Sequence, residues 1–259
     1  MTNLANARVI VTGGSAGLGL AMVEALAARG ASVTAIARDD TKLGAARDAG
    51  ARTIVGDATD AALIDRTVAD IDPDVLILNA GARLPLVTID QQDWDGFSAI
   101  WNTDVKATLI GIQAALKTPM RPGARVLIMS SGAAMVMSHP AIEPRSLRLS
   151  GGYIGAKRML WFMAHQANAV SRDHELGIRF QVLVPAQLMA GTELGHAVAA
   201  AYAQVEGVSV DEYMLKRYGP HLQPSQIGRQ VAELLAEPRH EMGIAYGFRV
   251  NTDILPLDQ

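Results

Sequence analysis

The sequence contains no cysteine among its 259 residues, which excludes disulfide bonds, thiolate catalysis and cysteine-ligated zinc. No apolar run approaches the roughly 18 residues that a membrane-spanning helix needs. The first residues also lack the basic and then apolar pattern of a signal peptide. We therefore expect a cytoplasmic protein that does not span a membrane.

An excess of positive charge is missing as well. The chain has 23 Lys and Arg against 26 Asp and Glu, a net charge of −3, so it has no general attraction to nucleic acid or anionic membranes. Its six histidines show no close metal-ligand pairing, and no metal is expected. With 49% hydrophobic residues, the chain is long enough for one large α/β domain and too short for two comfortable ones.

Strand-like and helix-like patterns alternate along the chain. The strand-like runs are apolar and nearly continuous: Arg8–Thr12, Ser32–Ala37, Arg52–Val55, Asp74–Asn79, Arg125–Ser130, Ile178–Val184 and Ile244–Tyr246. Helical periodicity lies between them, near 17–29, 41–49, 60–70, 93–117, 152–174 and 224–236. This alternation predicts a Rossmann-type, doubly wound α/β domain spanning residues 1–259. Its parallel sheet of about seven strands is covered by helices on both faces, with a ligand site outside the carboxyl ends of the strands.

Two stretches depart from this alternation. Residues 132–152 contain two prolines and two methionines, and they precede a predicted helix. We interpret them as a substrate-side insert with an apolar wall, where Arg145 or Arg148 can meet a carboxylate; a surface excursion or a subunit contact is the alternative. Residues 189–219 look helical but do not return directly to the sheet, which predicts a lid-like segment.

A glycine-rich turn, Thr12–Gly19, joins the first strand to the first helix. Gly13, Gly17 and Gly19 permit a tight turn and the close approach of a pyrophosphate, which backbone N–H groups and the positive helix end can hold. The same letters place Ser15 in a hydrolase-type nucleophile elbow. That alternative is disfavoured because the elbow would stand on the very first strand and no histidine has an evident place at a strand end.

The ends of the next strands carry candidate cofactor contacts. Arg38 ends the second strand, where a cation suits the 2′-phosphate of NADP and an acid would suit NAD, so NADP is predicted; a solvated loop arginine is the alternative. Asp57 and Ala58 follow the third strand, where the carboxylate can accept from adenine or cap a helix. Asn79 and Gly81 follow the fourth strand, in a small turn that a ligand can approach.

A tyrosine and a lysine provide the predicted acid–base chemistry. Tyr153 and Lys157 are four residues apart on a predicted helix, which places phenol and ammonium on one face. A tyrosine in water has a pKa of about 10, and a neighbouring cation favours the phenolate. Ser131 closes the fifth strand, where its hydroxyl can hold a substrate oxygen or satisfy a turn.

Together these residues resemble the short-chain dehydrogenase/reductase family in its shorter single-domain form. The match covers about residues 7–190 and consists of the glycine-rich turn, Asp57, Asn79-Ala80-Gly81, Ser131, Tyr153, Lys157 and Pro185. The resemblance implies a cofactor site formed by Gly13, Ser15, Gly17, Leu18, Gly19, Arg38, Asp57, Ala58, Asn79, Gly81, Tyr153, Lys157 and Pro185. It also implies that Ser131 orients the reacting oxygen, that Tyr153 is the acid or base, and that Lys157 binds the nicotinamide ribose and favours the phenolate.

The chain departs from the family pattern at a fourth catalytic position. Asp104 stands where the family usually has an asparagine that helps to hold a water in a proton relay. We expect its charge to pair with Lys157, to weaken the pull of the lysine on Tyr153 and to shift the pH optimum. Asn102, two residues earlier, is a poor substitute because it would point elsewhere on the helix.

These observations predict an NADP(H)-dependent oxidoreductase that moves a hydride between nicotinamide and a carbonyl or alcohol carbon of a small, apolar substrate. NAD(H) is the less favoured cofactor. The alternative is a protein of the same fold that binds NADP(H) as a sensor or scaffold without catalysis. The resemblance further implies a homodimer or homotetramer.

Overall fold

The structure, a computed structural model, describes residues 2–138, 149–189, 191–219, 221–250 and 252–258. Its centre is an eight-stranded sheet of order β3-β2-β1-β4-β5-β6-β7-β8. The strands are β1 Arg8–Thr12, β2 Ser32–Ala37, β3 Arg52–Val55, β4 Val75–Leu78, β5 Arg125–Met129, β6 Arg179–Pro185, β7 Ala245–Phe248 and β8 Leu255–Pro256. The first seven are parallel, and β8 pairs antiparallel with β7. The predicted doubly wound sheet is confirmed; the additional strand β8 is only two residues long, too short to carry a strand pattern.

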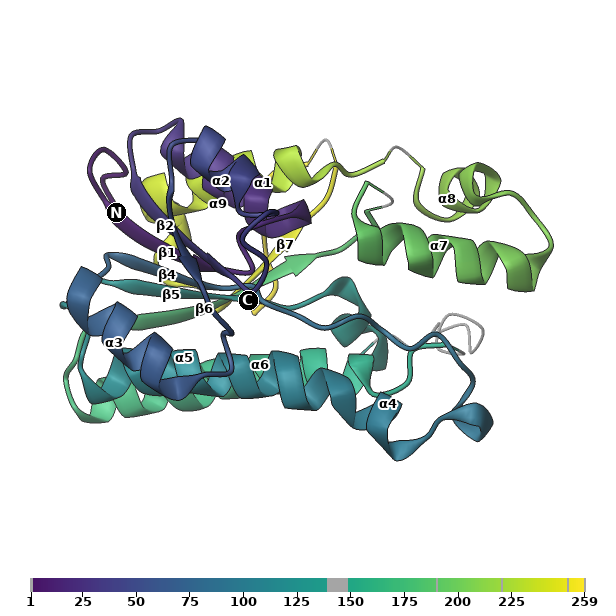
Figure 1. The fold of residues 1–259 in the computed structure, drawn as a ribbon, viewed down its shortest axis with the longest axis horizontal. Helices are drawn as coiled ribbons and strands as arrows, with labels where there is room; N and C mark the ends of the chain where they lie inside the picture. Colours follow the sequence, from purple (N-terminus) through teal and green to yellow (C-terminus); the bar gives the residue numbers. More distant parts are fainter. Residues whose placement is uncertain (1, 139–148, 190, 220, 251, 259) are drawn as a thin grey trace.

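Helices cover both faces of this sheet (Figure 1). They are α1 Gly17–Ala27, α2 Gly44–Asp48, α3 Ala61–Ile71, α4 Trp94–Ile100, α5 Lys106–Lys117, α6 Tyr153–Asp173, α7 Glu193–Glu206, α8 Val210–Tyr218 and α9 Pro224–Ala236. Helices α1 and α9 lie on one face, and α3, α5 and α6 lie on the other. Short 3-10 segments occupy Ile89–Gln91, Gly132–Ser138 and Pro238–His240.

Successive side chains of each strand point to opposite faces of the sheet, so two hydrophobic cores form, one on each face. Val9 and Val11 of β1 pack with α1 and α9, whereas Ile10 packs with α3, α5 and α6. Such side-to-side alternation is what a strand buried on both faces requires.

The helix predicted over 93–117 is interrupted. Between α4 and α5 the chain adopts a π-helical segment, Trp101–Val105, which holds Asp104. One extra residue per turn rotates the side chains that follow, and such segments are frequent at functional sites.

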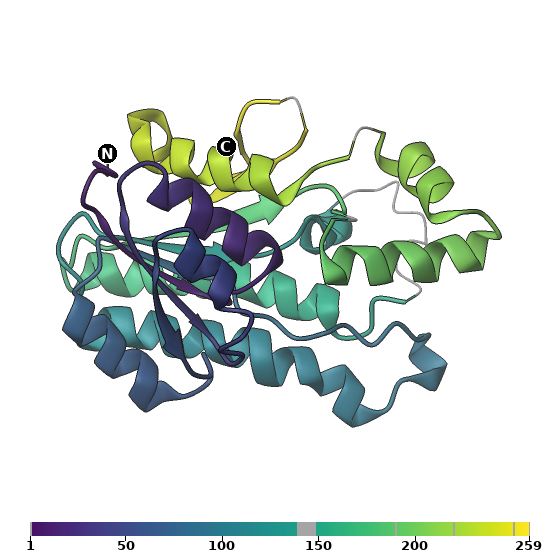
Figure 2. The same cartoon turned by 45° about the horizontal axis from the view of Figure 1, so that its top comes forward.

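Helices α7 and α8 form an arm that extends beyond the carboxyl end of the sheet (Figures 1 and 2). Tyr202, Tyr213 and Leu149 form a third apolar core inside this arm. The phenol oxygen of Tyr202 accepts a hydrogen bond of 3.2 Å from the Leu149 N–H, which ties α7 to the chain just before α6. The predicted lid-like segment is therefore a packed helical pair. The centre of the predicted insert, with Arg145 and Arg148, lies outside the described residues.

None of the helices in the described ranges combines the length and the apolar character needed to cross a membrane.

Candidate active site

A cleft of about 1230 Å³ opens at the carboxyl ends of the strands. It is lined by the ends of β1, β2, β4, β5 and β6, by the start of α6, and by α7 and α8. Most of the predicted site residues line it together: Gly13, Ser15, Gly17, Leu18, Arg38, Asp57, Ala58, Asn79, Gly81, Asp104, Ser131, Tyr153, Lys157 and Pro185. Gly19 is buried beneath the lining. The fold thus gathers residues that are far apart in the sequence at one edge of the sheet.

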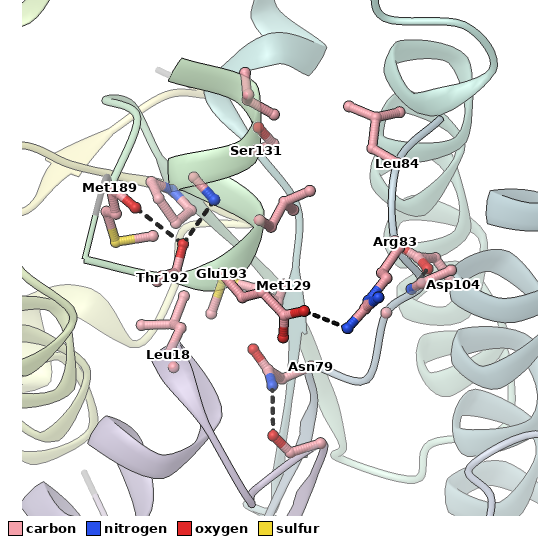
Figure 3. Close-up of a pocket in the computed structure, with 18 of the residues that line it drawn as sticks. Leu18, Asn79, Arg83, Leu84, Asp104, Met129, Ser131, Met189, Thr192 and Glu193 are labelled. Carbon is pink, nitrogen blue, oxygen red and sulfur yellow. Dashed lines mark hydrogen bonds and ion pairs between the residues drawn. The ribbon is translucent and has the colours of Figure 1, made fainter. Parts of the chain in front are cut away.

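The glycine-rich turn brings α1 against the end of β1. Gly13 has a φ of +69°, a conformation that favours glycine, and a Cβ on Gly19 would lie 2.0 Å from the Gly13 carbonyl oxygen. The Asn79 amide donates to the carbonyl oxygens of Thr12 and Gly13 at 3.2 and 3.3 Å, which fixes the turn from the β4 side (Figure 3). Asn79 therefore supports the turn in addition to lining the cleft.

The first turn of α1 faces the cleft without a side-chain cap. Several other helices are capped by their own side chains, for example α3 by Asp60 and α7 by Thr192. Uncapped N–H groups at a helix N-terminus form a site for an anion. Ser15 shares this turn, and no histidine lines the cleft within the described chain, so a serine hydrolase has no general base here.

The β2 and β3 ends form a charged corner. An Arg38 guanidinium nitrogen lies 3.9 Å from Asp57, and the Arg38 side chain is 72% exposed. Asp57 accepts from the Thr59 N–H and hydroxyl at 2.8 and 2.9 Å; chiefly because of that backbone bond, the pKa of Asp57 is lowered. Asp60, rather than Asp57, caps α3, so the helix-cap interpretation of Asp57 is wrong. Lys42, which no sequence motif marks, adds a second cation to this corner.

The opposite half of the cleft contains a buried ion pair. The Lys157 ammonium lies 2.8 Å from Asp104 Oδ2 and donates to the Met129 carbonyl oxygen at 3.2 Å. The two side chains are only 8% and 3% exposed. The same ammonium is 5.7 Å from the centre of the Tyr153 ring, so one cation contacts both the carboxylate and the tyrosine.

Two opposing effects set the proton affinity of this lysine. Burial lowers the pKa of Lys157, and the attraction of Asp104 and then Tyr153 outweighs that effect, so its pKa is raised. The ammonium therefore stays charged throughout the neutral range.

Asp104 is held by the loop after β4. Its Oδ1 accepts from the Ala82 N–H at 2.8 Å, and a Cβ on Gly81 would lie 3.1 Å from Oδ2. Asn102 donates instead to the Ser98 hydroxyl at 3.3 Å and is absent from the cleft lining. The π-helical segment thus presents Asp104 to the cleft.

Two neighbouring serines end β5 with different contacts. The Ser130 hydroxyl is buried and donates to the Lys157 carbonyl oxygen at 2.8 Å, which anchors the first turns of α6. Ser131 lines the cleft and accepts from the Ala133 N–H at 3.2 Å. Its oxygen therefore satisfies a turn, and within the described residues no hydrogen bond uses its hydroxyl proton, which can be donated to a ligand.

An ion pair crosses the cleft between two segments that are far apart in the sequence. Arg83, in the loop after β4, pairs with Glu193 in the first turn of α7 (Figure 3). Their side chains are 86% and 67% exposed, so this bridge lies at the cleft mouth. Neither residue belongs to a sequence motif, so this ion pair could not be predicted from the sequence.

Comparison with known proteins identifies the family of this chain and several relatives. The sequence model of the short chain dehydrogenase family matches residues 7–142. Oxidoreductase asL5 of Sarocladium schorii is 28% identical over 238 residues, which cover 87% of this chain and 86% of that protein. Gluconate 5-dehydrogenase of Gluconobacter oxydans is 33% identical over 155 residues, covering 55% and 59% of the two chains.

A solved structure of an actinorhodin polyketide ketoreductase variant with NADPH has the same fold. It aligns with a TM-score of 0.75 at 20% identity over 96% of this chain and 97% of that chain. The chain belongs to the short-chain dehydrogenase/reductase family, whose members are oxidoreductases that use a nicotinamide cofactor. Within the described residues, no cluster of three or more metal-ligating side chains forms.

Proposed function

We propose that this protein is an NADP(H)-dependent oxidoreductase that interconverts a carbonyl and an alcohol, with Tyr153 as the acid or base. The observation that carries the proposal is the placement of Tyr153 beside Lys157, in the cleft that also contains the glycine-rich turn. The similarity to a gluconate 5-dehydrogenase supports a reaction at an alcohol carbon.

The residues present fit a dinucleotide. The turn that Gly13 and Gly19 make compact, together with the uncapped start of α1, would hold the pyrophosphate. Arg38 and Lys42 would receive a 2′-phosphate at the end of β2, and this charge is the reason to favour NADP(H). The polyketide ketoreductase with NADPH is a precedent within the same fold. When bound, the nicotinamide supplies or accepts the hydride.

The side chains of this protein would manage the accompanying proton. Ser131 would donate a hydrogen bond to the substrate oxygen and orient it. Tyr153 would give its proton to that oxygen during reduction and take it back during oxidation. Lys157 would stabilise the phenolate left behind and hold the nicotinamide ribose, while Asp104 keeps the ammonium charged and in place.

The cofactor preference is tested at Arg38. We expect Arg38→Ala to raise the KM for NADPH about tenfold, the effect of losing a charge-assisted hydrogen bond, with little change in the KM for NADH. Lys117→Ala, an exposed lysine at the end of α5 and outside the cleft lining, is the charge-matched control. A wild-type preference for NADH at equal concentrations contradicts the assignment.

The sensor or scaffold alternative predicts a different pattern. It requires that NADPH stabilises the fold while no alcohol or carbonyl compound in a broad panel is turned over. NADPH oxidation that depends on an added ketone excludes it.

A homodimer or homotetramer in the cytoplasm is part of the same proposal. Trp94, Leu109 and Phe162 on α4, α5 and α6 are 74%, 45% and 56% exposed, more apolar surface than a monomer needs there. Light scattering of the wild type and of Phe162→Glu tests assembly, and cell fractionation tests location.

A further inference from the structure

A second group of cations lies at the end of the cleft away from Arg38. Lys216 on α8 and Arg249 just after β7 both line the cleft and are exposed to solvent. In the sheet, three strands separate β2, which positions Arg38, from β6, and four separate it from β7. Phosphates held at α1 and Arg38 therefore leave these two cations without a role in cofactor binding.

The carboxylates that line the cleft do not neutralise them. Asp57, Asp104 and Glu193 already pair with Arg38, Lys157 and Arg83. The fourth carboxylate of the lining, Asp39, follows Arg38 at the other end of the cleft and accepts from the Lys42 N–H at 3.1 Å. Within the described residues, neither Lys216 nor Arg249 has a carboxylate within ion-pair distance. This end of the cleft thus carries a local positive charge, although the whole chain has a net charge of −3.

Gln187 draws the two cation-bearing segments together. Its amide nitrogen donates to the Tyr218 carbonyl oxygen at 2.9 Å, and its amide oxygen accepts from the Val250 N–H at 2.9 Å. One side chain therefore links the end of α8 to the residue that follows Arg249. Because Lys216 lies on the last turn of α8, this bridge places both cations at one rim.

An apolar wall connects this rim to the predicted catalytic residues. Leu149, four residues before Tyr153, and Leu188 line the cleft. Tyr202, Tyr213 and Tyr218 belong to the same apolar cluster and continue the wall along the arm. The ring centres of these tyrosines follow one another at 6.1 and 6.3 Å. Burial raises the pKa of Tyr213, so its phenol is neutral and does not offset the cations.

We infer that the substrate of the proposed reaction is an oxo or hydroxy compound with an apolar body and an anionic end, and that Lys216 and Arg249 bind that end. The inference rests on the proposed function, because the reacting carbon must lie at Tyr153. The apolar body would lie against Leu149 and the tyrosine wall. A carboxylate is the simplest group that fits, and a phosphate shares its chemistry.

Three probes of equal chain length test this inference. They are 7-oxooctanoate, its neutral methyl ester and 7-oxooctyl phosphate, each assayed for NADPH oxidation and for equilibrium binding by calorimetry. We expect the wild type to favour an anionic probe over the ester about tenfold in kcat/KM, mainly through KM, as expected for a charge-assisted hydrogen bond at a partly exposed site. The better anion identifies the end group.

Matched variants attribute that preference to the two cations. Lys216→Gln and Arg249→Gln, alone and together, should reduce the ratio of anionic probe to ester, in turnover and in binding. Lys117→Gln, an exposed lysine at the end of α5 and outside the cleft lining, should leave the ratio unchanged.

The outcomes separate this inference from the proposed function. Equal turnover of anionic and neutral probes overturns the inference and leaves the proposed function standing. An anion preference that survives the double substitution also overturns it. If no ketone is reduced, the proposed function fails, and the calorimetric ratio of anion to ester binding decides the inference alone.

Discussion

A buried cation lies at each end of β5, Arg125 of the strand itself and Lys157 of α6, and the two have different hydrogen-bond partners. At the first residue of the strand, Arg125 donates to the Gln181 side chain at 2.7 Å and to the carbonyl oxygens of Leu234 and His240 at 3.1 and 3.2 Å. At the last residue, the Met129 carbonyl oxygen receives Lys157, whose other partner is a carboxylate. One cation thus has only neutral partners, and the other has a full countercharge.

That difference separates a structural charge from a functional one. Arg125 is 1% exposed and binds carbonyl oxygens at the end of α9, where the helix dipole favours a cation. Burial lowers the pKa of Arg125 to about 10, so it remains charged at neutral pH. Lys157 uses two of its three N–H donors on Asp104 and Met129, which leaves one for the cleft. Asp104 therefore holds the Lys157 ammonium in place while one of its N–H donors stays free to bind a ligand in the cleft.

The largest expected effect comes from removing the paired cation. Lys157→Met should lower kcat/KM by about 10³, within the usual range for losing acid–base assistance, and it strands Asp104 as a buried charge. Such stranding costs about 3 to 5 kcal/mol of unfolding free energy. Denaturant unfolding and steady-state kinetics measure the two effects. The double variant Lys157→Met with Asp104→Asn should recover stability but not activity; recovery of both contradicts the catalytic role.

Much of this arrangement could be predicted from the sequence. Continuous apolar runs predicted seven of the eight strands, and motif spacing with the family resemblance placed the glycine-rich turn, Tyr153, Lys157 and Asp104 in one cleft. The role of Arg125 could not be predicted, because a charged residue at the start of a strand resembles a solvated strand end and its partners come from α9 and the neighbouring β6. The π-helical segment at Asp104 and the Gln187 bridge depend on tertiary contacts, which local periodicity does not record.

Removing Arg125, the cation with neutral hydrogen-bond partners, should affect stability much more than activity. Arg125→Met removes the buried hydrogen bonds to the Gln181 side-chain oxygen and to the Leu234 and His240 carbonyl oxygens, at a cost of about 3 kcal/mol in unfolding free energy. Activity per folded molecule should change less than about twofold, because Arg125 does not line the cleft. Chemical denaturation and active-site titration measure both quantities. A large loss of kcat with intact stability would show that the amino end of β5 is coupled to catalysis.

A smaller effect is expected when Asp104 keeps its shape but loses its charge. Asp104→Asn removes the attraction that raises the pKa of Lys157, so burial dominates and the ammonium loses its proton at a lower pH. Stability and activity that depend on the protonated lysine should then disappear at a lower pH than in the wild type. Activity and melting temperature measured from about pH 6 to 11 would show this shift of the alkaline limb. Superimposable profiles contradict the electrostatic role of Asp104.

The most direct test of the account is the rate of hydride transfer in Tyr153→Phe. The account predicts that single-turnover oxidation of bound NADPH by a ketone slows by about 10³, while the Kd for NADPH and the melting temperature stay near the wild-type values. A Tyr153→Phe variant that reduces ketones as fast as the parent would contradict the assignment of the proton to this phenol.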